Sequence, residues 1–146
     1  MRTPRRLLLR MTCLLALYAG LGEARADIYV IANPNLPATQ LSREQIADLY
    51  LGRVRSVESG AYVILFDQPD AQPVRERFFK LIANMSLTQV NAYWARLTFT
   101  GRQHPPQSQA NDAKVIEAVS RDPRAIGYVG SPPSDNQVRV ILRLHE

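Results

Sequence analysis

The sequence is poor in the residues that carry most metal and thiol chemistry. Its 146 residues include one cysteine, Cys13, and two histidines, His104 and His145. Since no cysteine follows position 13, disulfides cannot hold the rest of the chain, even in an oxidising compartment. A zinc site needs three or four ligands, and these residues do not supply them at a recognisable spacing. The fold must therefore rest on packing, and we expect no metal site and no cofactor.

Catalytic signatures are also missing. The sequence contains no G-x-S-x-G, no P-loop pattern and no G-x-G-x-x-G, and its acidic residues are scattered singly. No nucleophile and base can be paired from the sequence. We therefore expect a protein that is not an enzyme and has no catalytic residues, and we interpret His104 as an ordinary loop histidine.

The first 26 residues have the pattern of a secretory signal peptide. Arginines precede a short apolar stretch (11–21), and the small residues Ala24 and Ala26 suit a signal peptidase that cuts before Asp27. A membrane anchor is the alternative, but a span needs about 20 apolar residues, roughly twice this stretch. We expect residues 1–26 to be removed and the protein to be periplasmic. Whether the Sec or the twin-arginine route exports it stays open.

Removal of this leader changes the charge of the protein. Five of the 18 basic residues and one of the 13 acidic residues lie in 1–26, which leaves 13 and 12 in residues 27–146 and a net charge near +1. A nucleic-acid-binding domain would be strongly basic. The sequence therefore predicts one domain of about 120 residues that binds no nucleic acid and has no membrane span.

Residues 27–146 alternate short apolar runs with helical patterns. Apolar, β-branched runs predict four strands, at Ile28–Ala32, Tyr62–Phe66, Ala125–Gly130 and Val138–Leu144. Capping residues, a proline and helical spacing predict four helices, beginning after Ser42, at Pro73, after Ser86 and after Asn111 or Asp112. Near-continuous apolar strands suit a parallel sheet covered on both faces. We expect an α/β domain with a mostly parallel sheet of about four strands flanked by about four helices.

Two further features refine this expectation. The segment 100–109 contains Gly101, Pro105 and Pro106 and predicts an irregular loop. The last strand carries Arg139 and Arg143 near its ends, a pattern typical of an edge strand protected from aggregation.

Four segments in this order resemble the second lobe of the periplasmic phosphate-binding proteins of ABC transporters. They are 30–37 (VIANPNLP), 41–53 (LSREQIADLYLGR), 62–78 and 123–129 (PRAIGYV). The resemblance covers nearly all of residues 27–146 and is strongest to short, single-lobe members of that superfamily. It implies one lobe of a type 2 periplasmic-binding fold, with phosphate or another small oxyanion as the ligand.

The resemblance also indicates where an anion would bind. Full-length phosphate binders place a basic residue and then Ser-Gly-Thr at a helix N-terminus, where hydroxyls and backbone N–H groups hold the oxyanion. The aligned residues here are Asp67 and Gln72-Pro73-Val74, and only Arg75 keeps a charge at a matching place. The resemblance therefore implies a degenerate anion site.

Five residues are candidate ligands of this site: Gln72, Arg75, Arg102, Ser42 and Asn111. Arg102 is included because a glycine-containing loop can bring backbone close to an anion. Two of them have a plainer alternative: Arg75 as a solvated helix residue near Glu76, and Asn111 as a helix cap. Trp94 and Tyr93 are interpreted as core residues.

Two functions follow from these observations. The first is a non-enzymatic, periplasmic solute-binding-like protein with a degenerate site for phosphate or another anion, which a homodimer or an envelope protein would complete. The alternative is a ligand-free interaction module that docks on a membrane sensor or another envelope partner.

Overall fold

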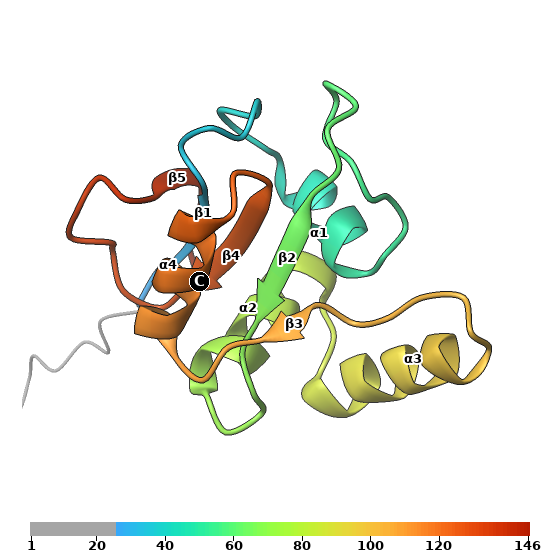
Figure 1. The fold of residues 1–146 in the computed structure, drawn as a ribbon. Coiled ribbons are helices and arrows are strands. Elements are labelled where there is room, and N and C mark those ends of the chain that lie inside the picture. The colour runs from blue at the N-terminus through green and yellow to red at the C-terminus, as the bar shows by residue number, and fades with distance from the viewer. Residues whose placement is uncertain (1–25) are drawn as a thin grey trace, which may run out of the picture.

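The computed structural model describes residues 26–146 (Figure 1). The expected leader therefore lies outside the described residues, except for Ala26. Nine elements follow one another: β1 (Ile28–Ala32), α1 (Arg43–Tyr50), β2 (Ile64–Asp67), α2 (Pro73–Ala83), α3 (Leu87–Phe99), β3 (Gln107–Ser108), α4 (Asp112–Arg121), β4 (Ala125–Val129) and β5 (Arg139–Leu144).

The five strands form one sheet in the order β3-β2-β4-β1-β5. β2 pairs in parallel with β4 and with β3, whereas β1 pairs antiparallel with β4 and β5. In the described part of the chain, four strands therefore share one direction and β1 runs against them. The expectation of an α/β domain with a mostly parallel sheet is confirmed.

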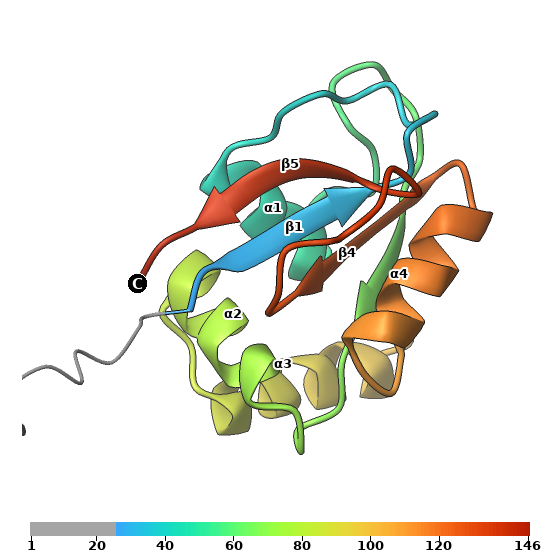
Figure 2. The same ribbon diagram turned by 90° about the vertical axis from the view of Figure 1, so that its left-hand side faces the viewer.

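Helices cover both faces of the sheet. Figures 1 and 2 show α4 on one face and α1 and α2 on the other, with α3 beside α2. Successive side chains of a strand point to opposite faces, and the burial follows this rule. Val30 and Tyr128 pack with the α1, α2 and α3 side chains, whereas Ile31 and Val129 pack against Val115 of α4. Two apolar layers therefore stabilise a sheet that is buried on both sides.

Local signals placed most elements correctly. Ser42 and Ser86 each accept the backbone N–H of the N3 glutamine, whose side chain accepts the serine N–H in return. β1 has the predicted bounds, and β5 lies at the edge of the sheet as predicted. Both capping boxes satisfy N–H groups that have no partner within the helix.

Two strand predictions need correction. The predicted loop 100–109 contains β3, a two-residue strand that pairs with Phe66 and Asp67 of β2. Pro105 and Pro106 have no N–H to donate, which explains why β3 is so short. A strand of this length next to two prolines gives no strand pattern in the sequence. β2 begins at Ile64 instead of Tyr62, because Tyr62 forms an isolated bridge with Ser56.

No helix within residues 26–146 is long and apolar enough to cross a membrane.

Gly127, in the middle of β4, allows α4 to approach the sheet. A Cβ atom at this position would lie 2.5 Å from Val115 Cγ1 and 3.0 Å from Val119 Cγ2. We predict that Gly127→Ala lowers the free energy of unfolding by about 1–3 kcal/mol through overpacking, measured by urea denaturation. Gly130→Ala is the control, because its Cβ would meet no atom closer than 3.4 Å. Equal losses for both variants would contradict close packing at Gly127.

Candidate functional site

Polar side chains meet where β2 and β4 end. β2 ends at Asp67 and β4 at Val129, and because the two strands are parallel, both carboxyl ends lie at the same edge of the sheet. α2 and α4 begin shortly after β2 and β3. In open α/β sheets, ligands bind at this edge, at the point where successive connections go to opposite faces. This edge is therefore the candidate site.

A buried ion pair lies at the centre of the site. One carboxylate oxygen of Asp67 is 3.1 Å from both Nε and Nη2 of Arg75. The other accepts the Gln68 backbone N–H at 2.7 Å and the Tyr128 hydroxyl. Asp67 is 4% exposed and Arg75 is 7% exposed. Such a pair is stable in the interior only when the remaining polar atoms are also satisfied.

The third nitrogen of the Arg75 side chain completes the arrangement. Nη1 donates to Asp70 at 2.6 Å and to Asn91 of α3 at 3.1 Å, and Asn91 also donates to Asp70 at 2.8 Å. All three guanidinium nitrogens therefore have partners within the protein. We refer to Asp67, Asp70, Arg75, Asn91 and Tyr128 as the Asp67–Arg75 cluster.

Gln68 connects this cluster to the beginning of α4. Its side-chain nitrogen donates to Asp112 at 2.8 Å and to the Tyr128 carbonyl at 3.1 Å. The other Asp112 oxygen accepts the backbone N–H of Gly130 at 2.9 Å. The Gln68 side-chain oxygen is buried and has no partner. An N–H group that could have held an external anion is thus bound to a carboxylate of the protein.

The charges in this network favour cations over anions. They are the carboxylates of Asp67, Asp70 and Asp112 and the guanidinium of Arg75. An approaching oxyanion would meet an excess of negative charge, which opposes its binding. Among residues 26–146, no group of three His, Cys, Asp or Glu side chains is arranged to hold a metal ion.

Two buried tyrosines belong to the same region. Burial, and after it the Asp67 charge, raises the pKa of Tyr128 and of Tyr50 well above the ordinary value of 10.0. The Tyr50 hydroxyl donates to the Phe66 carbonyl at 2.9 Å, and the Tyr128 ring stacks on Phe78 with centroids 3.8 Å apart. Both hydroxyls therefore act as hydrogen-bond donors that stay protonated at neutral pH.

Gln72 and Asn111 lie near one another at this edge. The Gln72 side chain donates to the Ala110 carbonyl at 3.0 Å, and the neighbouring Asn111 accepts the Lys114 N–H at 3.0 Å as the cap of α4. The plain capping role considered for Asn111 is thus present in the structure.

Ser42 and Arg102 lie elsewhere. Ser42 caps α1, and its neighbour Leu41 donates to Ile141 of β5, at the opposite edge of the sheet from β3. Arg102 lines a different cavity from the one that Arg75 lines. The structure therefore brings Gln72, Arg75 and Asn111 to one region and separates Ser42 and Arg102 from it.

The interpretation of Arg75 as a solvated helix residue is wrong, because the side chain is buried in an ion pair. The resemblance placed Asp67 at the site only as the acid that replaces a basic residue, and the sequence patterns did not indicate Asp70, Asn91 or Tyr128. A tyrosine within the apolar run 125–130 and an acid directly after a buried strand were the available signals. Neither shows that the two side chains meet, because 61 positions separate them.

An open cavity of about 640 Å³ borders the cluster. One part of it is lined by polar residues of this region, Asp67, Gln68, Asp70, Arg75 and Asn91. The rest is lined mainly by Pro69, Trp94, Ala95, Thr98, Phe99, Pro105, Pro106 and Ser108. Its size is in the range of small-molecule sites.

The ion pair makes a testable contribution to stability. We predict that Arg75→Met lowers the free energy of unfolding by about 3–5 kcal/mol, because it leaves the buried Asp67 carboxylate unpaired. The double variant with Asp67→Asn should lose less than the sum of the two single losses. Denaturant unfolding measures all three, with Arg53→Met as control, since its pair with Asp48 is exposed and worth about 0–1 kcal/mol. Additive losses would refute the coupling.

The tyrosines predict a loss of stability in alkali. Because their pKa values are raised in the folded state, the unfolded chain releases these protons first. The free energy of unfolding should be unaffected below about pH 10 and fall as the pH rises above it. Denaturant unfolding at a series of alkaline pH values measures the slope, which Tyr128→Phe should reduce. An unchanged slope in that variant would contradict the prediction.

Comparisons with known proteins support the fold. No protein-family model matches the sequence, and neither does any curated protein. The structure is similar to a protein from Clostridium perfringens described as a phosphate ABC transporter substrate-binding protein with bound phosphate (TM-score 0.60, 19% identity, 80% of this chain and 45% of that one). It is also similar to an ABC-type phosphate transport receptor from Vibrio cholerae (0.61, 16%, 80% and 46%) and to PstS from Borrelia burgdorferi (0.61, 16%, 80% and 47%).

The match spans less than half the length of each of these three proteins. At these identities the likeness concerns the fold. The chain therefore has the α/β fold of one lobe of a phosphate ABC transporter substrate-binding protein.

Proposed function

We propose that this protein is a non-enzymatic, exported solute-binding-like protein with a degenerate anion site at the N-terminus of α2. It holds phosphate or another small oxyanion weakly. The fold supports the general class, since the similar structures are described as phosphate-binding and phosphate-transport proteins. The leader-like pattern in residues 1–26 supports export.

One observation carries the degenerate character of the site. Nε, Nη1 and Nη2 of Arg75 are all bound to Asp67, Asp70 or Asn91. Arg75 is the residue that keeps a charge at a place matching the phosphate binders, and the protein's own carboxylates neutralise this charge. An external oxyanion must displace at least the exposed partner, Asp70, before it can reach Arg75.

Magnitudes indicate how weak the binding should be. Micromolar affinity corresponds to about 8 kcal/mol and millimolar affinity to about 4 kcal/mol. A charged hydrogen bond contributes about 1.5–3 kcal/mol, and a helix N-terminus about 0.3–1 kcal/mol. One or two such contacts on an open surface reach the millimolar range. We infer that a second copy of the chain or an envelope protein would have to complete the site for tighter binding.

Calorimetry with phosphate, sulfate and acetate tests this function. We expect a millimolar dissociation constant for at least one of them. Asp70→Asn should strengthen binding by about threefold to tenfold, because it removes a negative charge beside Arg75 Nη1. Asp70 is a suitable target, since 57% of its side chain is exposed.

Asp135→Asn is the matched control, because it makes the same chemical change on an exposed residue that lies outside the network. Its affinity should equal that of the unaltered protein. Micromolar binding by the unaltered protein would contradict a degenerate site, and the absence of heat in both the protein and Asp70→Asn would contradict anion binding at this place.

A further inference from the structure

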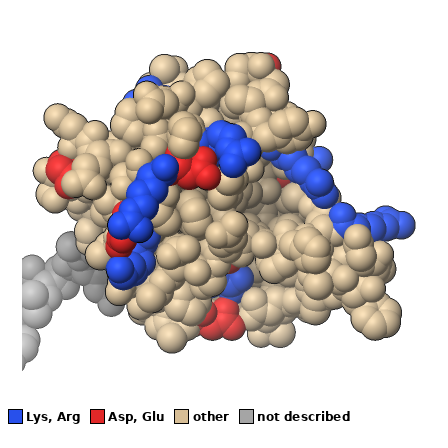
Figure 3. All heavy atoms as spheres, viewed as in Figure 1, with Lys and Arg blue, Asp and Glu red and all other residues tan. Residues whose placement is uncertain are grey.

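A second cavity, of about 390 Å³, lies between β2 and the loop that joins α3 to β3. It shares Trp94, Pro105 and Pro106 with the cavity beside the Asp67–Arg75 cluster, but none of the charged residues of that cluster. We refer to it as the Arg55–Arg102 groove. Figure 3 shows basic side chains around the hollow on the right-hand side of this face.

The charges that line this groove are all basic. Arg55, Arg102 and His104 contribute to its lining, and no aspartate or glutamate does. Nη2 of Arg55 contacts the Arg102 carbonyl at 3.4 Å, which places the two residues side by side. Within residues 26–146, neither arginine forms an ion pair, whereas the nearby Arg53 pairs with Asp48. Two arginines that have no carboxylate partner in the described residues therefore line one groove, which favours the binding of anions.

The remaining lining is largely apolar. Its carbon surface comes from Leu49, Val63, Leu65, Trp94, Pro105 and Pro106. Trp94 is 6% exposed, and its buried indole N–H has no acceptor in the described protein. Buried polar groups are normally hydrogen-bonded, so this N–H is an exception. A ligand with an apolar body would pack against the carbon surface of the groove.

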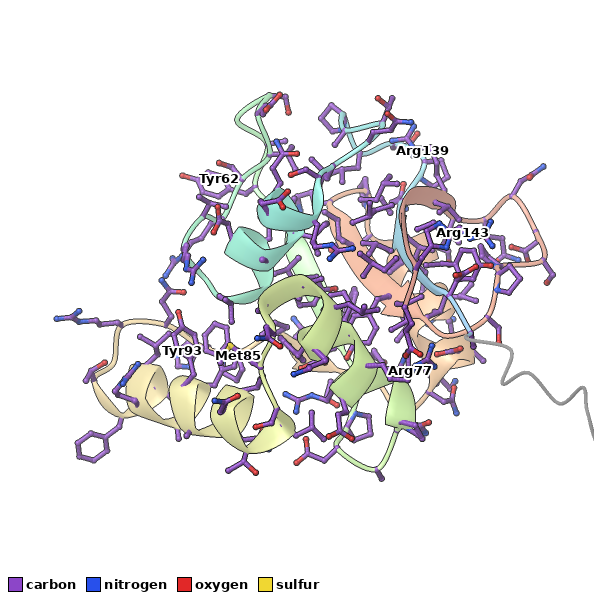
Figure 4. The ribbon with its side chains drawn as sticks, turned by 180° about the vertical axis from the view of Figure 1, so that it is seen from behind. Tyr62, Arg77, Met85, Tyr93, Arg139 and Arg143 are labelled. Carbon is purple, nitrogen blue, oxygen red and sulfur yellow. The ribbon has the colours of Figure 1, made fainter. Side chains whose placement is uncertain are left out.

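Specific contacts hold the walls of the groove in place. The Gln103 side chain donates to the Gly52 carbonyl at 2.6 Å, and the Tyr93 hydroxyl donates to the Leu51 carbonyl at 2.6 Å. Gly52 has a φ of +67°, and a Cβ there would lie 1.9 Å from the Gln103 side-chain oxygen. Figure 4 shows Tyr93 extending from α3 toward this end of α1. The loop and α3 are therefore both tied to the end of α1.

The short strand β3 keeps the groove open. β3 pairs with β2 only at Phe66 and Asp67, so Ile64 and Leu65, which line the groove, have no described strand on that side. Pro105 and Pro106 prevent β3 from extending beside them, because proline has no N–H to donate. The gap at this edge of the sheet is thus built into the sequence.

We propose that the Arg55–Arg102 groove binds a small organic anion, a carboxylate on an aromatic or aliphatic body. The carboxylate lies between the two guanidinium groups, and the body packs against Trp94 and the two prolines. An inorganic ion would use the charges but leave the apolar walls empty, and a neutral molecule would leave the charges uncompensated. The groove shares no charged residue with the anion site at the N-terminus of α2. The proposal for the groove can therefore be tested independently of the proposed function.

Trp94 is the only tryptophan of the chain and lines both this groove and the cavity beside the Asp67–Arg75 cluster, so its fluorescence responds to a ligand in either place. Titration of the purified protein with benzoate should give a saturating change in Trp94 fluorescence. Acetate has the charge without the body, and benzyl alcohol has the body without the charge. Both should bind at least about tenfold more weakly than benzoate. No saturation with benzoate, or equal responses to benzoate and benzyl alcohol, would overturn the proposal.

Substitutions identify the residues involved. The double variant Arg55→Gln with Arg102→Gln should weaken benzoate binding by about tenfold or more, and both side chains lie on exposed residues whose loss leaves the core intact. Arg43→Gln is the control, because Arg43 is also exposed and lines none of the cavities described above. Unchanged benzoate affinity in the double variant would refute the site.

Asp70→Asn separates this site from the one at α2. That variant should leave benzoate binding unchanged while it alters phosphate binding, and the double arginine variant should do the reverse. Parallel changes of both ligands in both variants would show a single shared site and overturn the assignment of the organic anion to the Arg55–Arg102 groove.

Discussion

The ion pair between Asp67 and Arg75 is the interaction on which the candidate site depends. Both side chains are buried, so each is costly to hold in the interior unless the other compensates its charge. Asp67 ends β2 and accepts from Tyr128 of β4, while Arg75 lies in α2 and donates to Asn91 of α3. One pair thus connects four elements at the edge of the sheet where β2 and β4 end.

The same pair weakens the attraction of that edge for anions, because the Arg75 charge is neutralised. The N-termini of α2 and α4 offer a favourable dipole and free N–H groups. However, Asn111 caps α4, the Asp112 carboxylate binds the Gly130 N–H, and Asp67 and Asp70 neutralise Arg75. Arg55 and Arg102 have no such carboxylate in the described part of the chain. Arginines without a carboxylate partner in the described residues therefore line the groove beside Trp94, outside the place that the resemblance indicates, and the proposed anion site at α2 is weak.

Predictions from sequence succeeded where the signal was local. The capping boxes at Ser42 and Ser86 fixed two helix starts, because the cap and its partner lie three residues apart. β3 was missed, since a strand of two exposed residues has no periodicity to detect. The burial of Arg75 was missed because it depends on partners from α3 and from the end of β2. Local chemistry predicted the elements, while the charge state of the site depends on tertiary contacts.

Contact area explains why an organic anion suits this domain better than an inorganic one. A small inorganic oxyanion gains affinity almost entirely from hydrogen bonds and charge, at about 1.5–3 kcal/mol per charged bond, and needs donors on several sides to reach micromolar affinity. The described domain matches less than half the length of each similar phosphate-binding protein. It therefore offers donors to an anion from one side. An organic anion also gains about 25 cal/mol for each Å² of apolar surface that it buries. A groove with a tryptophan and two prolines supplies that surface from one side, so it can retain a ligand without a second lobe.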